Sequence, residues 1–135
     1  MWKRVRFILL VIIFMNFGAQ LVLSARLYPE KVYQEYWCKK YGGYSEVKLA
    51  DETRVDCVLN DYAIEFDFAN KWGESIGQSL YYSISLNKKA GVVLIMEDMQ
   101  RDKRYLARLL KVADLNNITV WTISPDDLIY NISYR

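Results

Sequence analysis

Hydrophobic residues recur along this chain with two kinds of spacing, which together predict alternating helices and strands. Apolar residues three and four positions apart are typical of amphipathic helices, here predicted over residues 28–41, 70–86 and 101–116. Alternating or continuous apolar runs are typical of strands, here predicted over residues 46–49, 54–59, 62–69, 91–96 and 118–123. This order, α-β-β-β-α-β-α-β, predicts an α/β fold with a mixed central sheet flanked by helices.

Short polar stretches and glycines mark the joints between these elements. The turn at residues 59–61 is short and polar, which suits a hairpin between the second and third strands. Asn70 suits the N-cap of the second helix. Gly73 and Gly77 would each weaken that helix, and their spacing suggests close packing against another element. No repeat or linker divides the chain, so one domain is expected.

The N-terminal residues have the pattern of a secretory signal peptide. A basic start is followed by an apolar core over residues 7–17 and by a cleavage site near Ser24 or Ala25. The alternative is an uncleaved N-terminal anchor, although the apolar run is short for a membrane span. The prediction is a signal peptide over 1–25 and one domain over 26–135, periplasmic or secreted, without stable membrane association after cleavage.

Loss of the signal peptide would change the charge of the chain. The remainder carries 15 basic and 16 acidic residues, a net charge near −1, which excludes a strongly basic nucleic-acid-binding protein. Any contact with phosphate must then come from local clusters of charge. One such cluster is a basic stripe on the helix over 101–116, which is either a solvated face or a phosphate-contacting edge; it comprises Arg101, Arg104, Arg108 and Lys111.

The two cysteines, Cys38 and Cys57, both lie in the predicted domain. An even number of cysteines in an exported chain suggests a disulfide, which would tie the first helix to the second strand. The alternative is a pair of buried thiols that behave as small hydrophobic groups. The chain has no histidine and no C-x-x-C pair, so these residues do not suggest a metal site.

Three acidic residues lie on the two central strands of the meander. Glu65 and Asp67 are two residues apart, so both point to one face of their strand. The hairpin can place Asp56 beside Glu65 on the neighbouring strand. Carboxylates that meet in one place repel one another unless a cation lies between them, and Mg²⁺ is the usual ion where all ligands are oxygens. Asp56, Glu65 and Asp67 are therefore candidate ligands for Mg²⁺, with Mn²⁺ as a substitute.

The helix that follows carries a polar stripe beside these acids. Lys71, Gln78 and Tyr82 fall within a narrow angle of the helix, which a solvated helix face would also explain. In the first helix, Glu35 is either a surface acid or a fourth carboxylate for the cluster.

The element order and these acids resemble the PD-(D/E)XK nuclease superfamily, which has a restriction-endonuclease-like fold. Its signature is an aspartate on the second strand and E-x-K on the third, which correspond here to Asp56 and to the run from Glu65 to Asp67. Exonuclease and resolvase branches add Q-x-x-x-Y on the next helix, which corresponds to the run from Gln78 to Tyr82. The resemblance covers about residues 30 to 97. It implies an exported, Mg²⁺-dependent phosphodiesterase that cleaves nucleic acid.

The resemblance also implies roles for these residues. Asp56, Glu65 and Asp67 would hold the metal, with Glu35 helping a second ion, and Gln78 and Tyr82 would position the nucleic-acid backbone. Asp67 stands where the family has lysine, so either Lys71 supplies the missing ammonium group or the site is a relic that cleaves poorly. The alternative function is a catalytically inactive nuclease-fold domain that acts as a periplasmic or secreted binding protein.

Overall fold

The computed structural model describes residues 25–129, so that all of the predicted signal peptide except Ala25 lies outside the described residues. Each predicted helix and strand is present, with its ends shifted by a few residues, and the helical turn that residues 124–127 suggest is present as a short C-terminal helix. The elements are α2 (Glu30–Lys40), β1 (Tyr44–Lys48), β2 (Arg54–Val58), β3 (Tyr62–Phe68), the 3₁₀ turn η1 (Ala69–Lys71), α3 (Trp72–Leu86), β4 (Lys89–Ile95), α4 (Met99–Leu115), β5 (Thr119–Ile123) and α5 (Pro125–Ile129).

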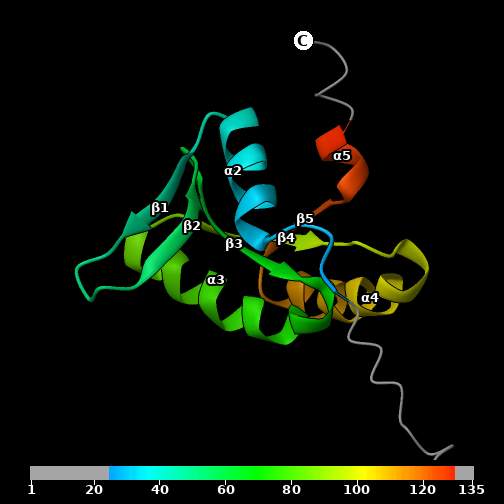
Figure 1. Ribbon diagram of the computed structural model, residues 1–135. Helices are drawn as coiled ribbons and strands as arrows, with labels where there is room; N and C mark the ends of the chain where they lie inside the picture. Colours follow the sequence, from blue (N-terminus) through cyan, green and yellow to red (C-terminus); the bar gives the residue numbers. More distant parts are fainter. Residues whose placement is uncertain (1–24, 130–135) are drawn as a thin grey trace, which may run out of the picture.

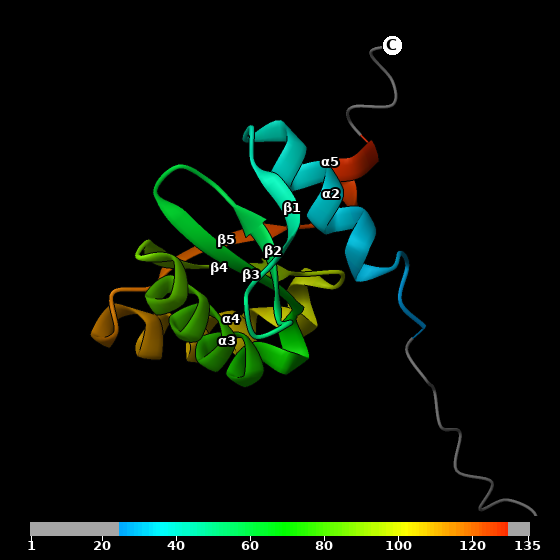
Figure 2. The same ribbon diagram turned by 90° about the vertical axis from the view of Figure 1, so that its left-hand side faces the viewer.

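The five strands form one mixed sheet in the order β1-β2-β3-β4-β5. The first three strands are antiparallel neighbours, whereas β3, β4 and β5 run parallel to one another. Parallel neighbours need a crossover between them, and α3 and α4 supply the two crossovers. In Figure 1, α2 and α5 lie above the sheet and α3 and α4 lie below it, an arrangement that Figure 2 shows from the side. The predicted α/β class, with a mixed sheet between helices, is confirmed.

Each face of the sheet has its own hydrophobic core. On the side of α2, Tyr33 and Trp37 pack against the β3 side chains of Ile64, Phe66 and Phe68. On the other side, α3 and α4 cover the inner strand β4 and the edge strand β5 with a second hydrophobic core, whose buried apolar residues include Val92, Leu94, Met96, Leu109, Ala113 and Ile118. Because β4 is buried on both faces, its sequence is a continuous apolar run rather than an alternating one.

Local details of two helices differ from the predictions. Pro29 is extended at φ −58° and ψ 146°, so the first helix begins at Glu30 rather than at Tyr28. Asn70 is not the N-cap of α3, because it lies inside the turn η1 and Lys71 takes the capping position. The expectation that Gly73 and Gly77 pack closely against another element was wrong. A Cβ atom at either residue would meet nothing within 4 Å among the described residues.

A disulfide joins Cys38 of α2 to Cys57 of β2, with their Cα atoms 5.8 Å apart. Of the two alternatives that the sequence left open, the bonded pair is therefore the one present. Gly43 passes directly beside this bond, and a Cβ atom there would stand 2.7 Å from the Cys57 sulfur and 2.8 Å from the Cys38 sulfur. The disulfide thus fixes α2 against the strand that carries Asp56.

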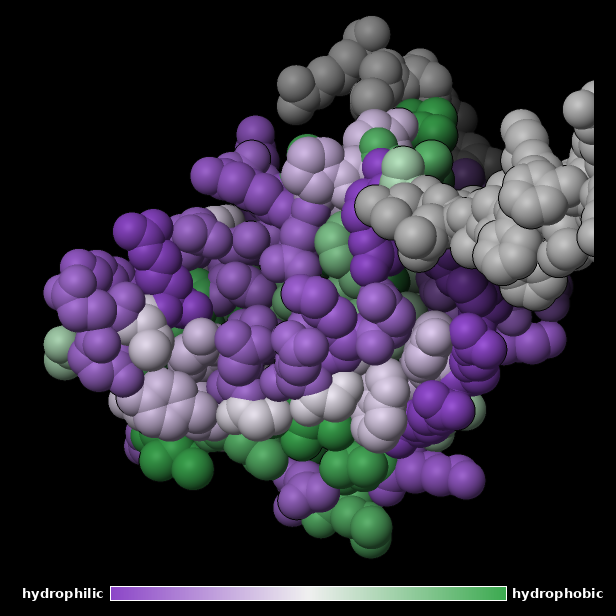
Figure 3. All heavy atoms as spheres, turned by 60° about the horizontal axis from the view of Figure 1, so that its bottom comes forward, coloured by the Kyte–Doolittle hydropathy of each residue, from purple (hydrophilic) through white to green (hydrophobic). Residues whose placement is uncertain are grey.

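Figure 3 shows that the surface over α3 and α4 is largely hydrophilic, with hydrophobic residues in smaller patches. The exposed apolar side chains of these helices are spread along them: Tyr81, Ile84, Met99, Leu110 and Leu115. Scattered exposed apolar residues are normal on a folded domain. Within residues 25–129, no helix has both the length and the apolar character needed to cross a membrane.

Removal of the disulfide should lower stability without changing the fold. Cys38 and Cys57 are 19 positions apart, and closure of a loop of this size stabilises a protein by about 3 kcal/mol in the chain-entropy description. The Cys38→Ser, Cys57→Ser double variant should therefore lose about that much unfolding free energy in urea. Wild-type protein measured with a reductant should match the double variant, and an unchanged midpoint in both would contradict a structural role.

Gly77→Ala should stabilise the protein by about 0.5–1 kcal/mol, because alanine favours a helix interior and the added methyl group has open space. Gly91→Ala is the matched control in β4. There the new Cβ would stand 2.8 Å from the Trp121 ring and 3.0 Å from Ile64, so stability should fall. Thermal unfolding of both variants checks the pair, and a loss of stability in Gly77→Ala would contradict the open environment of that residue.

Candidate active site

The two acids of β3 lie on the face of the sheet that α3 covers. Ile64, Phe66 and Phe68 occupy the opposite face, and the alternation of the strand turns Glu65 and Asp67 toward α3. Both residues are deeply buried, with 6% of Glu65 and 4% of Asp67 exposed. Acidic side chains are rarely buried to this extent without a partner, so this face of β3 is unlike an ordinary sheet surface.

Asp56 lies at a local interruption of the sheet. Cys57 and Val58 pair with Ile64 and Ala63 of β3, but the ladder does not continue to Asp56. Instead, the Phe66 N–H donates a hydrogen bond to Oδ2 of Asp56 at 2.8 Å. The carboxylate thus takes the place of a backbone acceptor, and β2 and β3 separate at this point.

The ladder between β1 and β2 is interrupted at the same level. The Asp56 carbonyl oxygen accepts a hydrogen bond from Nε2 of Gln34 at 2.7 Å, and the same amide donates to Oε1 of Glu46 at 2.8 Å. Glu46, which lies opposite Asp56, has a φ of +57°, a left-handed conformation that is unfavourable for a side-chain-bearing residue. Strained backbone of this kind is concentrated at functional sites, so the interruption itself points to this place.

The carboxyl groups of the half-buried Asp56 and the buried Glu65 are neighbours that interact electrostatically. Burial raises the pKa of Glu65 far above its usual range, and the charges of Asp56 and Asp67 raise it further. Burial raises the pKa of Asp56 as well, against the lowering effect of the Phe66 N–H. Two buried carboxyl groups in contact cannot both be ionised at low cost, so one of them carries a proton when no cation is near.

One oxygen of this pair is left without a partner. Oε2 of Glu65 is buried and has no hydrogen-bond partner among the described residues. Almost all buried polar atoms in proteins are hydrogen-bonded, and an exception needs a physical explanation. A hard cation coordinated by that oxygen would provide one, because carboxylate oxygens are its preferred ligands.

Asp67 is the third member of the cluster. Burial, followed by the charge of Glu30, raises the pKa of Asp67 to about 7, although Lys71 lowers it. Its Oδ1 accepts a hydrogen bond from the Phe68 N–H at 3.0 Å. At neutral pH this carboxyl group is therefore only partly ionised, which limits its repulsion of Glu65.

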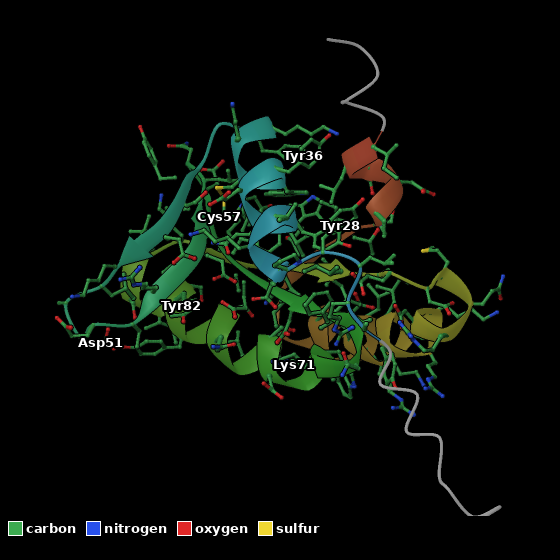
Figure 4. The ribbon with its side chains drawn as sticks, in the orientation of Figure 1. Tyr28, Tyr36, Asp51, Cys57, Lys71 and Tyr82 are labelled. Carbon is green, nitrogen blue, oxygen red and sulfur yellow. A yellow bond between two sulfur atoms is a disulfide. The ribbon has the colours of Figure 1, made fainter. Side chains whose placement is uncertain are left out.

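Lys71 and Tyr82 both interact electrostatically with the acids, but Lys71 does so from the turn η1 rather than from the helix in which the sequence placed it. The charge of Lys71 acts on Asp67 and on Glu30, which places its ammonium group at the Asp67 end of the cluster. Burial, followed by Glu65 and Asp56, raises the pKa of Tyr82 to about 12. Figure 4 shows the two side chains toward opposite ends of the same helical segment. Gln78 is exposed one turn before Tyr82, at the edge of this arrangement.

Glu35 is not brought to the cluster. Its side chain is 59% exposed on the outer surface of α2 and forms a salt bridge with Lys31 at 3.6 Å. Glu30 lies there in its place, since it is half-buried at the start of α2 and its charge acts on Asp56, Glu65 and Asp67. The signal for Glu30 was present in the sequence, because it shares the inward stripe of α2 with Gln34 and Cys38.

The cluster is not a preformed cage for a metal. Across residues 25–129, no three carboxylate, thiolate or imidazole groups are arranged so that they could hold a metal ion as they stand. No protein family model, curated protein or solved structure matches the chain, so the residues themselves carry the functional interpretation.

Asp67→Asn should reduce the loss of stability that accompanies rising pH. The pKa of Asp67 rises from 3.8 to about 7 on folding, so the folded chain holds a proton that the unfolded chain releases, and stability falls between about pH 4 and pH 7. The variant lacks this proton. Without divalent ions, the unfolding free energy of the wild type should fall between pH 4 and pH 8 by up to about 4 kcal/mol more than that of the variant, at about 1.4 kcal/mol per pKa unit.

Urea unfolding at both pH values measures this difference. Asp114→Asn, which changes an exposed acid near the end of α4, is the control and should follow the wild type at both pH values. Equal pH dependence in Asp67→Asn and wild type would show that Asp67 is ionised in the folded protein as readily as in the unfolded chain.

Proposed function

We propose that this protein is an exported, metal-dependent phosphodiesterase of the PD-(D/E)XK type that hydrolyses nucleic acid. The observation that carries the proposal is Oε2 of Glu65, a buried carboxylate oxygen next to Asp56 that has no hydrogen-bond partner among the described residues. The element order and the placement of Asp56 and Glu65 on adjacent strands agree with the resemblance. The role of residues 1–25 as a signal peptide is part of the same proposal, and N-terminal sequencing of the exported protein tests it.

The residues fit a hard divalent cation. Asp56 and Glu65 offer carboxylate oxygens, and the Phe66 carbonyl group and Asp67 are further oxygen donors on the same strand. This donor set suits Mg²⁺, with Mn²⁺ as a substitute. When bound, such an ion lowers the pKa of a coordinated water and stabilises the charge that develops on a phosphodiester. It would also remove the reason for the shared proton between Asp56 and Glu65.

The neighbouring side chains would act on the substrate. Lys71 carries a positive charge at the Asp67 end of the cluster, where it would orient a phosphate or the attacking water. Tyr82 keeps its proton at neutral pH, since its pKa is raised to about 12, and its hydroxyl group can donate to a phosphate oxygen. Gln78 lies at the exposed edge, where it would contact the nucleic-acid backbone.

A second function is favoured by one feature, which is Asp67 at the position of the family lysine. A third buried carboxyl group adds repulsion where the family has a positive charge. The protein would then be a catalytically inactive nuclease-fold domain whose acids hold a cation in a binding site. Such a domain would still be stabilised by Mg²⁺ but would not hydrolyse nucleic acid.

Asp56→Asn and Glu65→Gln should each lower the cleavage rate by roughly 100-fold or more. Each removes a carboxylate that would hold the metal ion, and that ion would stabilise the negatively charged transition state. The assay uses single- and double-stranded DNA and RNA with Mg²⁺, with Mn²⁺ and with a chelator. Glu35→Gln is the matched control, since it removes one acid from the exposed side of α2 and should cleave at the wild-type rate.

Thermal unfolding with and without Mg²⁺ separates the two functions. A cation bound by the folded state raises its stability, and Asp56→Asn or Glu65→Gln should abolish that rise. The rise without cleavage would support the inactive binding domain. If the protein shows no cleavage and Mg²⁺ has no effect on its stability, both functions are contradicted.

A further inference from the structure

A second polar site lies at the end of β3, next to the acid cluster. It is a pocket of about 240 Å³ lined by Arg26, Asn70, Arg101 and Tyr105. These residues come from three separate parts of the chain: the segment before α2, the turn η1 and the first half of α4. The pocket therefore exists only in the folded domain. It includes Arg101, one member of the basic stripe for which the sequence offered two interpretations.

Both guanidinium groups of the pocket are held in place from behind. Arg26 donates to Oδ1 of Asn70 at 2.5 Å, lies 3.8 Å above the centre of the Phe68 ring and faces Oε2 of Glu97 at 3.9 Å. Arg101 donates twice to Asp102, from Nε at 2.7 Å and from a terminal nitrogen at 3.2 Å. Anchored arginines lose little conformational freedom when they bind an anion, which favours binding.

The acids that anchor the arginines are shielded from the pocket opening. The side chains of Glu97 and Asp102 are 6% and 3% exposed, whereas those of Arg26 and Arg101 are each 34% exposed. A solvent-borne ligand therefore reaches the two arginines more readily than these two carboxylates, and the exposed acid beside the pocket is Asp98, which accepts a hydrogen bond from the Arg101 backbone N–H. Buried acids behind exposed arginines orient the guanidinium groups while leaving their outer edges positively charged.

The other two lining residues add neutral donors. The Tyr105 hydroxyl oxygen accepts a hydrogen bond from Arg104 at 2.9 Å, which leaves its own proton to donate. The side-chain oxygen of Asn70 accepts from Arg26, and its amide nitrogen carries two hydrogens as further donors. The lining thus combines two positive charges with N–H and O–H donors, which is the chemistry that recognises a phosphate group.

The pocket adjoins the acid cluster through consecutive residues. Asn70 of the pocket is followed directly by Lys71, and both follow Asp67 within the turn that ends β3. The charge of Arg26 acts on Glu30 at the cluster and on Asp102 at the pocket. A polyanionic strand that crosses the acids would therefore meet this pocket next, on the side of Lys71.

We propose that the pocket formed by Arg26, Asn70, Arg101 and Tyr105 binds a phosphate group of a nucleic-acid strand, adjacent to the phosphate group that a cation at Asp56 and Glu65 would hold. This inference rests on the proposed function for the identity of the strand, but not on cleavage. The pocket fixes the position of the strand on the domain and carries no sequence preference, since it contacts phosphate rather than bases. It also assigns a task to a local positive cluster in a domain whose overall charge is near neutral.

The test measures binding of a fluorescent single-stranded DNA oligonucleotide, and of the RNA of the same sequence, to the purified protein in excess chelator. Arg26→Gln and Asn70→Asp should each weaken binding of whichever strand binds by about tenfold, as expected for loss of a hydrogen bond to a charged group. Arg26→Gln should also lower the slope of log K against log salt by about one. Tyr105→Phe removes only one O–H donor and should weaken binding by about threefold.

Lys111→Gln is the matched control. It removes one positive charge from the exposed surface of α4, outside the pocket, and should change binding less than twofold. Equal losses in Lys111→Gln and Arg26→Gln would overturn the proposal in favour of general charge attraction. The proposal would be overturned if the protein bound neither the DNA nor the RNA strand. It would also be overturned if the protein bound only vesicles of an anionic phospholipid. Thermal unfolding of each variant confirms that the fold is retained.

The outcomes separate the pocket from the proposed activity. If the pocket variants weaken binding in chelator while no preparation cleaves nucleic acid with Mg²⁺, the pocket stands and hydrolysis does not. If the wild type cleaves nucleic acid but Arg26→Gln, Asn70→Asp and Tyr105→Phe all bind like wild type, hydrolysis stands and the pocket does not.

Discussion

The contact between Asp56 and Glu65 is the interaction that the rest of this structure accommodates. Two carboxyl groups buried side by side disfavour the ionised state, and the sheet around them does not supply a compensating cationic group from the strands. Instead, β2 separates from its neighbours at Asp56. There the Gln34 side chain donates a hydrogen bond to the Asp56 carbonyl oxygen, and the Phe66 N–H donates one to the Asp56 carboxylate. A sheet optimised for stability alone would place apolar residues here and keep its ladders continuous.

Several features that are far apart in the sequence support the interrupted sheet around Asp56. Glu46 adopts a left-handed conformation opposite Asp56, which only a well-supported neighbourhood can maintain. The disulfide supplies part of that support, because it fixes α2, and with it Gln34, against β2. The hydrophobic contacts of Tyr33 and Trp37 hold the same helix on the sheet. Stability gained in the core on the side of α2 thus offsets the cost of buried acids on the side of α3.

The sequence predicted the fold well because the fold follows from local patterns. The continuous apolar run of β4 reflects burial on two faces, and the element order then leaves few topologies; β3 is buried on both faces as well, although its sequence alternates apolar and acidic residues. The adjacency of β2 and β3 was predictable for the same reason, since a short hairpin joins them, whereas the end of their ladder before Asp56 was not. Details that depend on tertiary packing were less accessible, such as the open space around Gly77.

The choice of acid on α2 shows where local reasoning ends. Glu35 and Glu30 are chemically identical, and only the rotation of the helix on the sheet decides which of them reaches the cluster. That rotation is fixed by which aromatic residues are buried, and Tyr33 and Trp37 are buried whereas Val32 is 40% exposed. The pocket at Arg26 was beyond sequence reasoning, because its four residues come from segments far apart in the chain.

The position of Asp67 fits these charges into one arrangement. A lysine at this place would neutralise the acids from within the strand, whereas here the nearby positive groups, Lys71 and Arg26, lie on the flanking turn and the N-terminal segment. Inside the cluster the acids raise one another's pKa by repulsion, whereas the arginines at its rim are paired with the carboxylates of Glu97 and Asp102. The proposed cation would offset the repulsion among the acids, and the proposed phosphodiester strand would contact the arginines, so that the two proposals together account for both groups of charges.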